Sequence, residues 1–228
     1  MPPGARWWTL GKLRAYAAQS EPFVHIDSDV FLWERLPDRL SGAAVLAQNP
    51  ERFTVGSGAY RPDLLELAFR EADLGLPVEW SWYAAHGGDT AACCGVFGGS
   101  DLGFIAHYAD AAAGMALRAD RARLDLARLG TVGINILVEQ YFLSACSAYH
   151  ALGAERPRAG LAVEYLFPSA GEAYAPEQGG EARFTHLIAA AKRDPVALKR
   201  LDRRVQRHHP VQYMRLCRYL ARRGPSRG

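Results

Sequence analysis

The stretch PFVHIDSDVFLW, residues 22–33, decides the fold of this 228-residue chain. Phe23–Ile26 is apolar enough to predict a buried strand, and two carboxylates, Asp27 and Asp29, follow it with only Ser28 between them. Side chains two residues apart in an extended segment point the same way, so both acids face one side if the extended conformation persists through Ser28. The sequence therefore predicts an acidic pair at the carboxyl end of a buried strand.

Two carboxylates this close repel each other unless one keeps a proton or a cation lies between them. Mg²⁺ and Mn²⁺ prefer such oxygen ligands and commonly share them with substrate phosphates. In open α/β sheets, ligands bind at the carboxyl ends of strands. The alternative is a polar turn in which aspartate satisfies backbone groups.

Strands alternate with helices along the rest of the chain, which predicts the α/β class, with a mixed, mainly parallel sheet flanked by helices. We expect a single domain over 1–228, formed by a core over 1–194 and a basic helical tail over 195–228. The remaining strands are expected at Ala43–Ala47, Ala92–Asp101 and Leu161–Phe167, and the main helices at Trp8–Ala18, Pro62–Ala72, Phe104–Leu117, Asn135–His150 and Val196–Ala221.

Composition is that of a globular protein, with 49% hydrophobic and 22% charged residues. No uninterrupted apolar run approaches the roughly 20 residues that span a bilayer, and the start MPPGARWW is unlike a signal peptide. We therefore expect the cytoplasm, with four reduced, buried cysteines. No C-x-x-C pair occurs, and we expect no cysteine to have a histidine at zinc-like spacing.

Charge is distributed unevenly. Residues 191–228 hold twelve lysines and arginines against two acids, a net charge of +10, whereas the whole chain carries only +3. A basic end on an acidic body favours an anionic partner, such as a membrane surface that the protein would bind peripherally. Nucleic acid is disfavoured because no recognised binding motif accompanies the basic residues, and a solvated helix with no such partner is the alternative.

Two later motifs carry further chemistry. The segment CCGVFGG, residues 93–99, contains Gly98 and Gly99, which allow a ligand to approach the backbone closely. The segment FTHLIAAAK, residues 184–192, places His186 six residues before Lys192. Imidazole is a ligand for Mn²⁺, and a lysine ammonium binds phosphate. Taken singly, a hairpin, a half-buried histidine and a surface lysine explain these residues equally well.

Together with the pair Glu139-Gln140, these motifs resemble metal-dependent glycosyltransferases of the A-type fold, most closely families 8 and 32 and an uncharacterised bacterial family. The similarity extends from Trp8 to about Tyr213. It implies transfer of a sugar, with retention at the anomeric carbon, from a nucleotide-diphosphate sugar to an unknown acceptor, which could be a glycan, a peptide or a small molecule.

The resemblance also implies roles for single residues. Asp27 would lie near the ribose and, with Asp29 and His186, would hold Mn²⁺ or Mg²⁺. Lys192 would bind the diphosphate, and Lys12 would touch the nucleotide.

Four further residues would surround the sugar. Gly98 and Gly99 would line the donor or acceptor sugar, and Glu139 and Gln140 would be the catalytic pair beside the reacting sugar. Neighbouring helical positions point about 100° apart, so we expect only one of that pair, Glu139, to face the site.

The sequence departs from the family 8 pattern in several places. Ala189 stands where a glycine is expected, and Arg193-Asp194 where Pro-Trp is expected. Only 26 residues precede Asp27, so we expect the N-terminal nucleotide-binding part to be missing, as in a truncated or inactive relative. A D-x-D phosphatase of the haloacid-dehalogenase type is a further alternative, although Phe31 replaces its usual Thr or Val. The non-catalytic alternative is a basic module that binds nucleic acid or a membrane.

Overall fold

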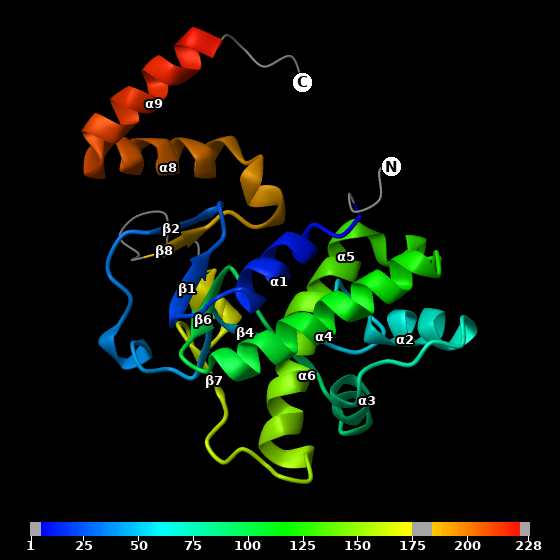
Figure 1. Cartoon of the computed structure of the whole chain (residues 1–228). Coiled ribbons are helices and arrows are strands. Elements are labelled where there is room, and N and C mark those ends of the chain that lie inside the picture. The colour runs from blue at the N-terminus through cyan, green and yellow to red at the C-terminus, as the bar shows by residue number, and fades with distance from the viewer. Residues whose placement is uncertain (1–5, 175–183, 224–228) are drawn as a thin grey trace. The chain divides into compact units, whose positions relative to one another are not determined.

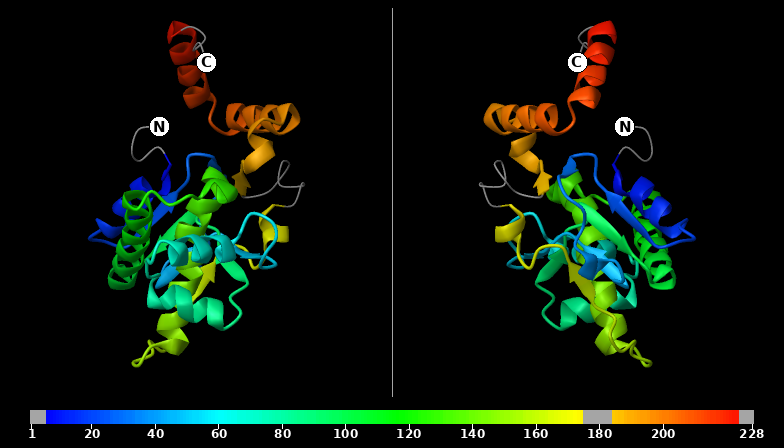
Figure 2. Two further views of the ribbon diagram at one scale, coloured as in Figure 1. Left: turned by 90° about the vertical axis from the view of Figure 1, so that its right-hand side faces the viewer. Right: turned by 90° about the vertical axis from the view of Figure 1, so that its left-hand side faces the viewer.

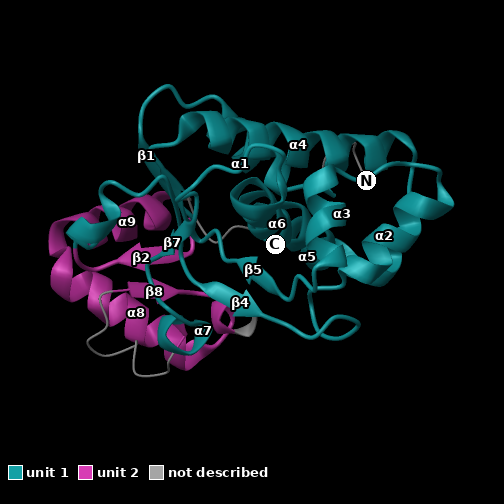
Figure 3. Cartoon of the chain, turned by 90° about the horizontal axis from the view of Figure 1, so that it is seen from below, with its two compact units in different colours: residues 1–27, 35–173 teal, residues 28–34, 174–228 magenta. Residues whose placement is uncertain are grey.

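The computed structural model describes residues 6–174 and 184–223 and confirms the α/β class (Figure 1). Contacts along the chain divide it into two compact units (Figure 3). Unit 1 comprises residues 1–27 and 35–173, and unit 2 comprises residues 28–34 and 174–228. The boundary that the sequence suggested after residue 194 falls inside unit 2, because the tail helices pack with the short strands that precede them.

Unit 1 contains a four-stranded mixed sheet in the order β1-β6-β3-β7, with the two-stranded ribbon β4-β5. Its strands are β1 (Phe23–Ile26), β3 (Val45–Ala47), β4 (Pro50–Arg52), β5 (Thr90–Ala92), β6 (Val96–Gly99) and β7 (Val163–Tyr165). Its helices are α1 (Thr9–Ala17), α2 (Pro62–Glu71), α3 (Val78–Ala85), α4 (Leu102–Arg121), α5 (Gly130–Ile136), α6 (Phe142–Ala148) and α7 (Ala170–Ala173). Short 3₁₀ turns form η1 (Asp38–Leu40) and η2 (Ala127–Leu129), and π-helical turns form η3 (Leu137–Tyr141) and η4 (Tyr149–Gly153).

The expectation of a mainly parallel sheet is wrong. In the described part of unit 1, β6 runs antiparallel to both β1 and β3, and only the β3–β7 pair of this sheet is parallel. Strands of three or four residues carry no signal of direction in their sequence, since the alternation of side chains is the same in both pairings.

The core of unit 1 lies where α1, α4 and the helix that runs from α5 to η4 meet the sheet. Helix α4 lies beside α1, as the two side views show (Figure 2). Large aromatic rings fill this core and supply much of its buried apolar area. The fully buried rings include Tyr16, Trp80, Phe97, Tyr108 and Tyr141.

The segment Ala127–Gly153 is long and apolar enough to cross a membrane by length and composition, with a mean hydropathy of 1.2. Single polar residues interrupt this segment, so it does not stand out as an uninterrupted apolar run in the sequence. However, 67% of that apolar window is buried within the fold. The core helix of a globular domain has the same composition, so the segment is weak evidence for a membrane span.

Unit 2 is built on the two-stranded ribbon of β2 (Val30–Leu32) and β8 (Phe184–His186). The chain then forms the 3₁₀ turn η6 (Ala189–Lys192) and two helices, α8 (Pro195–His208) and α9 (Pro210–Arg223). Trp33, just past β2, fastens α8 to this ribbon. Its indole nitrogen donates to Thr185 Oγ1 at 3.0 Å, and the Arg204 guanidinium lies 4.4 Å from the centre of its ring system.

The cysteines are free, as expected, but their burial is not uniform. Cys93, Cys94 and Cys146 are buried in unit 1, whereas Cys217 is exposed on α9. The prediction of burial is therefore wrong for Cys217. It lies on a helix whose other residues are also mostly exposed, so no core covers that thiol.

Candidate active site

In unit 1 the carboxyl end of β1 carries a lysine that bridges two carboxylates. Lys12 Nζ lies 2.9 Å from Asp27 Oδ1 and 2.7 Å from Glu139 Oε1. The three residues come from α1, from the residue after β1 and from η3, and the sequence analysis had selected all three. Their convergence makes the end of β1 a charged site at the edge of an aromatic core.

The elements that carry this site are fixed by polar contacts at their ends. At the start of α1, the Thr9 hydroxyl donates to Asn135 Oδ1 at 2.8 Å, and the Asn135 amide donates to the Thr131 carbonyl at 2.7 Å. The π-turn that carries Glu139 frees a backbone carbonyl, as such turns do. Tyr108 of α4 donates its hydroxyl to the Glu139 carbonyl at 2.8 Å. These bonds join α1 to α5 and η3 to α4.

Burial and charge set the protonation of the three groups. The Glu139 side chain is fully enclosed, and its Oε2 lacks a hydrogen-bond partner. Burial raises the pKa of this carboxyl, although Lys12 opposes the effect. Burial alone would lower the pKa of the Lys12 ammonium, but Glu139 and Asp27 raise it above its ordinary value. Burial also works against the charge on Asp27, yet His25 and Lys12 lower the pKa of that carboxyl.

Sequence reasoning missed two members of this cluster. The Tyr16 hydroxyl donates to Glu139 Oε1 at 3.2 Å, and His25 Nε2 lies 2.9 Å from Asp27 Oδ1. Their spacing was the available signal. Tyr16 lies four residues after Lys12 on one face of a helix, and His25 lies two residues before Asp27.

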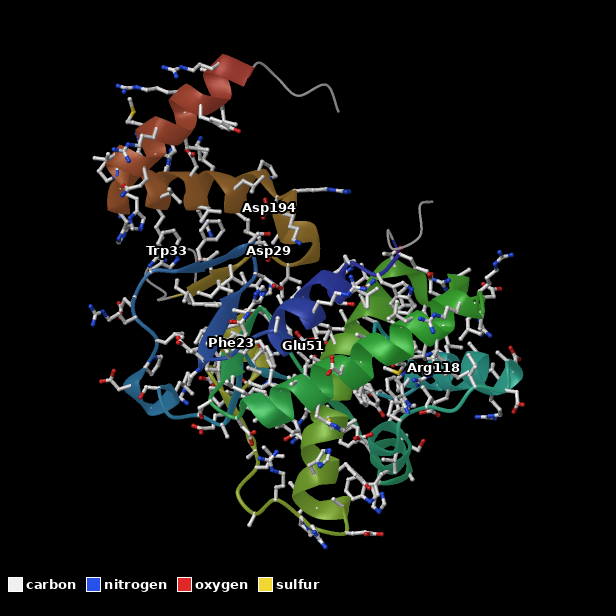
Figure 4. All side chains as sticks on the ribbon, viewed as in Figure 1. Phe23, Asp29, Trp33, Glu51, Arg118 and Asp194 are labelled. Atoms are coloured by element: carbon white, nitrogen blue, oxygen red, sulfur yellow. The ribbon has the colours of Figure 1, made fainter. Side chains whose placement is uncertain are left out.

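Unit 2 holds the second group of predicted residues. The pairing of Val30 with His186 in the β2–β8 ribbon brings residues 29 and 186 together. His186 Nε2 lies 3.5 Å from Asp29 Oδ1, and Lys192 Nζ lies 2.6 Å from Asp29 Oδ2. Asp29 also accepts a backbone hydrogen bond from Leu187 at 2.9 Å. The labelled Asp29 is seen at one end of β2, with Trp33 beyond the other end (Figure 4).

This convergence agrees with the spacing argument for His186 and Lys192. The strand β8 ends at His186, and the single 3₁₀ turn that follows returns Lys192 to the same carboxylate. The Lys192 side chain is 54% exposed and that of His186 only 8%. An imidazole nitrogen, a carboxylate and a half-exposed ammonium therefore meet at one end of the β2–β8 ribbon.

The extended conformation does not persist through Ser28, so the condition for Asp27 and Asp29 to face one side is not met. β1 ends at Ile26, and Ser28 and Asp29 form a turn before β2 begins at Val30. Asp27 thus belongs to unit 1 and Asp29 to unit 2. The small, polar residues of D-S-D suit a turn, which was the alternative interpretation of the motif.

The structure does not bring Gly98 and Gly99 to the Lys12 cluster. Gly99 pairs with Phe23, at the start of β1, whereas Asp27 donates its backbone N–H to Gly95 at 2.9 Å. Four residues of strand, about 13 Å, separate the two ends. Gly99 instead lines a hollow of about 240 Å³.

Strand packing accounts for these two glycines. A Cβ on Gly98 would lie 2.0 Å from the Phe23 carbonyl oxygen, and one on Gly99 would lie 2.2 Å from that of Ala44. The two residues thus let β6 run between β1 and β3. Contact with a sugar stays a prediction for both.

Glu139 and Gln140 point to different surroundings, as the helical geometry predicts. The Tyr60 hydroxyl lies within hydrogen-bond distance of Gln140 Oε1 and of the Glu51 carboxylate, whereas Glu139 faces Lys12. Only Glu139 lies in the cluster at the end of β1.

Comparison with models of protein families finds a match over residues 4–219, to a family of unknown function, DUF6734. Comparisons with curated proteins and with solved structures find no match.

Proposed function

Because the chain belongs to DUF6734, a family of unknown function, its activity has to be inferred from its own residues, and we propose that it is a metal-dependent glycosyltransferase. It would move a sugar from a nucleotide-diphosphate donor to an acceptor hydroxyl. The observation that carries this proposal is the meeting of Asp29, His186 and Lys192 at one end of the β2–β8 ribbon. The A-type fold and retention at the anomeric carbon belong to the proposal, on the resemblance alone.

The donor set fits a hard or borderline divalent cation. Asp29 offers a carboxylate and His186 an imidazole, and this combination suits Mn²⁺ better than Mg²⁺. Asp27 is the proposed third ligand, since only Ser28 lies between the two acids and two residues span at most about 7 Å. When bound, the metal would neutralise charge on the diphosphate of the donor.

Lys192 is the proposed contact to the departing diphosphate. The bond between the anomeric carbon and the phosphate oxygen breaks, and the nucleoside diphosphate leaves with its electron pair. The acceptor hydroxyl forms the new glycosidic bond and loses its proton. Negative charge on the leaving oxygen grows during the step, so an exposed ammonium stabilises the transition state more than the ground state.

Lys12 and Glu139 have a linked role in the proposal. Lys12 is the proposed contact to the nucleotide, and its present partners are Asp27 and Glu139. Glu139, held by Lys12, is the proposed carboxylate beside the reacting sugar. Gln140 would support the same turn of the helix from its other face, through Tyr60.

A membrane surface is the proposed location of the enzyme, on the evidence of α9. Three arginines recur three and four residues apart on α9, namely Arg215, Arg218 and Arg222. Leu216 and Leu220 lie four residues apart on another face of the helix. Both leucines are at least half exposed. A helix with a basic face and an uncovered apolar face is typical of peripheral binding to anionic lipid.

Thermal denaturation tests the binding part of the proposal. Full-length protein is melted with Mn²⁺ and each common nucleoside diphosphate, and Mn²⁺ binding is followed by electron paramagnetic resonance. We expect one diphosphate to raise the Tm in the presence of Mn²⁺ only. Asp29→Asn should abolish that rise, and Asp38→Asn, at an exposed aspartate in η1, should retain it. Equal rises in wild type and Asp29→Asn would contradict the metal site.

Turnover of labelled nucleotide sugars separates the remaining candidates. Release of the nucleoside diphosphate supports the transferase. Ligand binding without turnover would instead identify an inactive relative. Release of inorganic phosphate from a general phosphatase substrate, lost in Asp27→Asn, would favour the D-x-D phosphatase and overturn the proposal.

A further inference from the structure

A second cluster of metal-ligating side chains lies in unit 1, at the junction of α3, α4 and the end of α6. It consists of Glu79, His107, Cys146 and His150, and one ligand atom from each lies within 4.8 Å of all the others. α3 packs against α6 and η4, and α4 packs against α6 (Figure 1). Three separate segments of the chain therefore deliver four potential ligands to one point.

We propose that these four side chains form a structural site for Zn²⁺ or a similar borderline-soft divalent ion. One thiolate, two imidazoles and one carboxylate are ligand types that zinc takes in a tetrahedral arrangement. Ligand atoms at zinc distances of about 2.0–2.3 Å would lie about 3.5 Å apart, so closure of the present cluster requires shifts of about 1 Å. All four positions are filled from the protein, which is typical of structural sites.

The hydrogen bonding of the cluster is incomplete without an ion. His107 Nε2 lies 2.7 Å from Glu79 Oε1, and His150 Nε2 lies 3.4 Å from the same oxygen. The His150 nitrogen is shut off from solvent and has no hydrogen-bond partner. Leaving a buried ring nitrogen without a partner costs free energy, and an ion bound there would supply one.

Access and charge also suit an ion. The His107 side chain is 47% exposed, which gives an entry path from solvent, whereas Glu79 is buried. The buried negative charge of Glu79 would be compensated by the cation.

The sequence analysis missed this site. Cys146 and His150 lie four residues apart in a helix that the sequence did predict, and such residues share one face. The expectation that no cysteine has a histidine at zinc-like spacing does not hold for this pair, whose ligand atoms lie within 4.8 Å of each other. Glu79 and His107 come from other helices, so no local motif marks them.

Cobalt(II) substitution tests the proposal, because a thiolate bound to cobalt gives an intense charge-transfer band in the near ultraviolet. Full-length protein is stripped with a chelator, and Co²⁺ and then Zn²⁺ are titrated in. We expect one equivalent of cobalt to produce that band with tetrahedral visible bands, and Zn²⁺ to displace it. The same titration of Zn²⁺ should raise the Tm.

Variants assign the ligands. Cys146→Ser should lose the charge-transfer band, and Cys93→Ala, at a buried thiol outside the cluster, should keep it. His107→Ala removes an exposed side chain and should fold normally. This variant should weaken metal binding by at least about tenfold, because loss of even a group that only hydrogen-bonds a metal ligand has an effect of that size. Circular dichroism of each metal-free variant checks that it is folded.

Three outcomes would overturn the proposal. The first is the absence of a thiolate band in the folded wild type. The second is a band that survives in Cys146→Ser, and the third is an affinity unchanged in His107→Ala. Asp29→Asn should leave the cobalt spectrum unaltered, so this site stands or falls independently of the proposed transferase site.

Discussion

Lys12 Nζ lies 2.7 Å from the fully buried Glu139 carboxylate and 2.9 Å from Asp27. The ammonium is the only cation that the described part of unit 1 places against Glu139, and Glu139 Oε2 has no hydrogen bond. A buried pair of this kind contributes little beyond what apolar side chains of the same size would contribute, but removal of one partner leaves an uncompensated charge. The stability of the end of β1 therefore depends on Lys12.

Lys12→Met should destabilise the protein by about 3–5 kcal/mol at neutral pH, the usual cost of breaking a buried ion pair. Burial already raises the pKa of Glu139 above 4.5, and loss of Lys12 raises it further. The variant buries Glu139 at lower cost when the carboxyl is protonated than when it is ionised. The free energy of unfolding of the variant should therefore fall as pH rises from 4.5 through the folded pKa of Glu139. The cost of the substitution should grow with pH, measured by urea unfolding between pH 4 and pH 8.

The double variant Lys12→Met/Glu139→Gln should recover a large part of that loss, because an amide carries no charge to bury. Lys199→Met, at an exposed lysine of α8, serves as the control and should change the free energy of unfolding by less than about 0.5 kcal/mol. A cost for Lys12→Met that is independent of pH would contradict the role of Glu139.

Asp27 should support stability in the opposite pH range. His25 and Lys12 lower the pKa of its carboxyl from 3.8 against the effect of burial. The contribution of Asp27 is thus present above pH 3.8 and is lost as pH falls through the folded pKa. Asp27→Asn should cost about 1.5–3 kcal/mol at pH 7, the value of a hydrogen bond to a charged group.

The difference between wild type and Asp27→Asn should shrink in acid. Guanidinium unfolding at pH 7 and at pH 3 measures it, with Asp38→Asn as the exposed aspartate for comparison. A difference that stays constant in acid would show that the substitution acts through packing.

Gly98→Ala should destabilise the sheet by about 1–3 kcal/mol or more, as overpacking does. The new Cβ would lie 2.0 Å from the Phe23 carbonyl oxygen, which is backbone and cannot turn aside. Gly11→Ala is the matched control. A Cβ on Gly11, inside α1, would meet no neighbouring atom within 4 Å, so alanine should stabilise that helix by about 0.5–1 kcal/mol. Thermal melting of both variants tests whether Gly98 serves strand packing, and a neutral Gly98→Ala would refute it.

Local patterns predicted the elements well, and contacts between distant segments less so. The apolar run Phe23–Ile26 and the proline that starts α2 are local signals, and both elements begin at the predicted residues. The direction of β6 depends on pairing with β1 and β3, which no local pattern records. The resemblance grouped Asp29 with His186, and the structure places their side chains 3.5 Å apart, whereas metal binding by the two stays a prediction.

The tail should bind vesicles that contain phosphatidylserine and not vesicles of neutral lipid alone. α9 presents Arg215 and Arg218 on one face, and each basic residue near an anionic surface contributes about 1 kcal/mol. Arg215→Gln/Arg218→Gln should therefore weaken binding about 30-fold in vesicle co-sedimentation. Leu216→Ser/Leu220→Ser should weaken it as well, through the apolar face. Equal binding to random DNA, with a steep salt dependence, would favour a nucleic-acid module.

Lys192→Ala should lower kcat for the nucleotide sugar by about 10²–10³-fold, as loss of one preorganised donor to a developing oxyanion does. The Lys192 side chain is 54% exposed and held by Asp29, so its removal leaves no buried charge, and the variant should fold. KM should change little, because the leaving oxygen carries more charge in the transition state than in the bound donor. Lys199→Ala, on the following helix, should keep the wild-type kcat. If Lys192→Ala raises KM and leaves kcat unchanged, Lys192 binds the donor without assisting its departure.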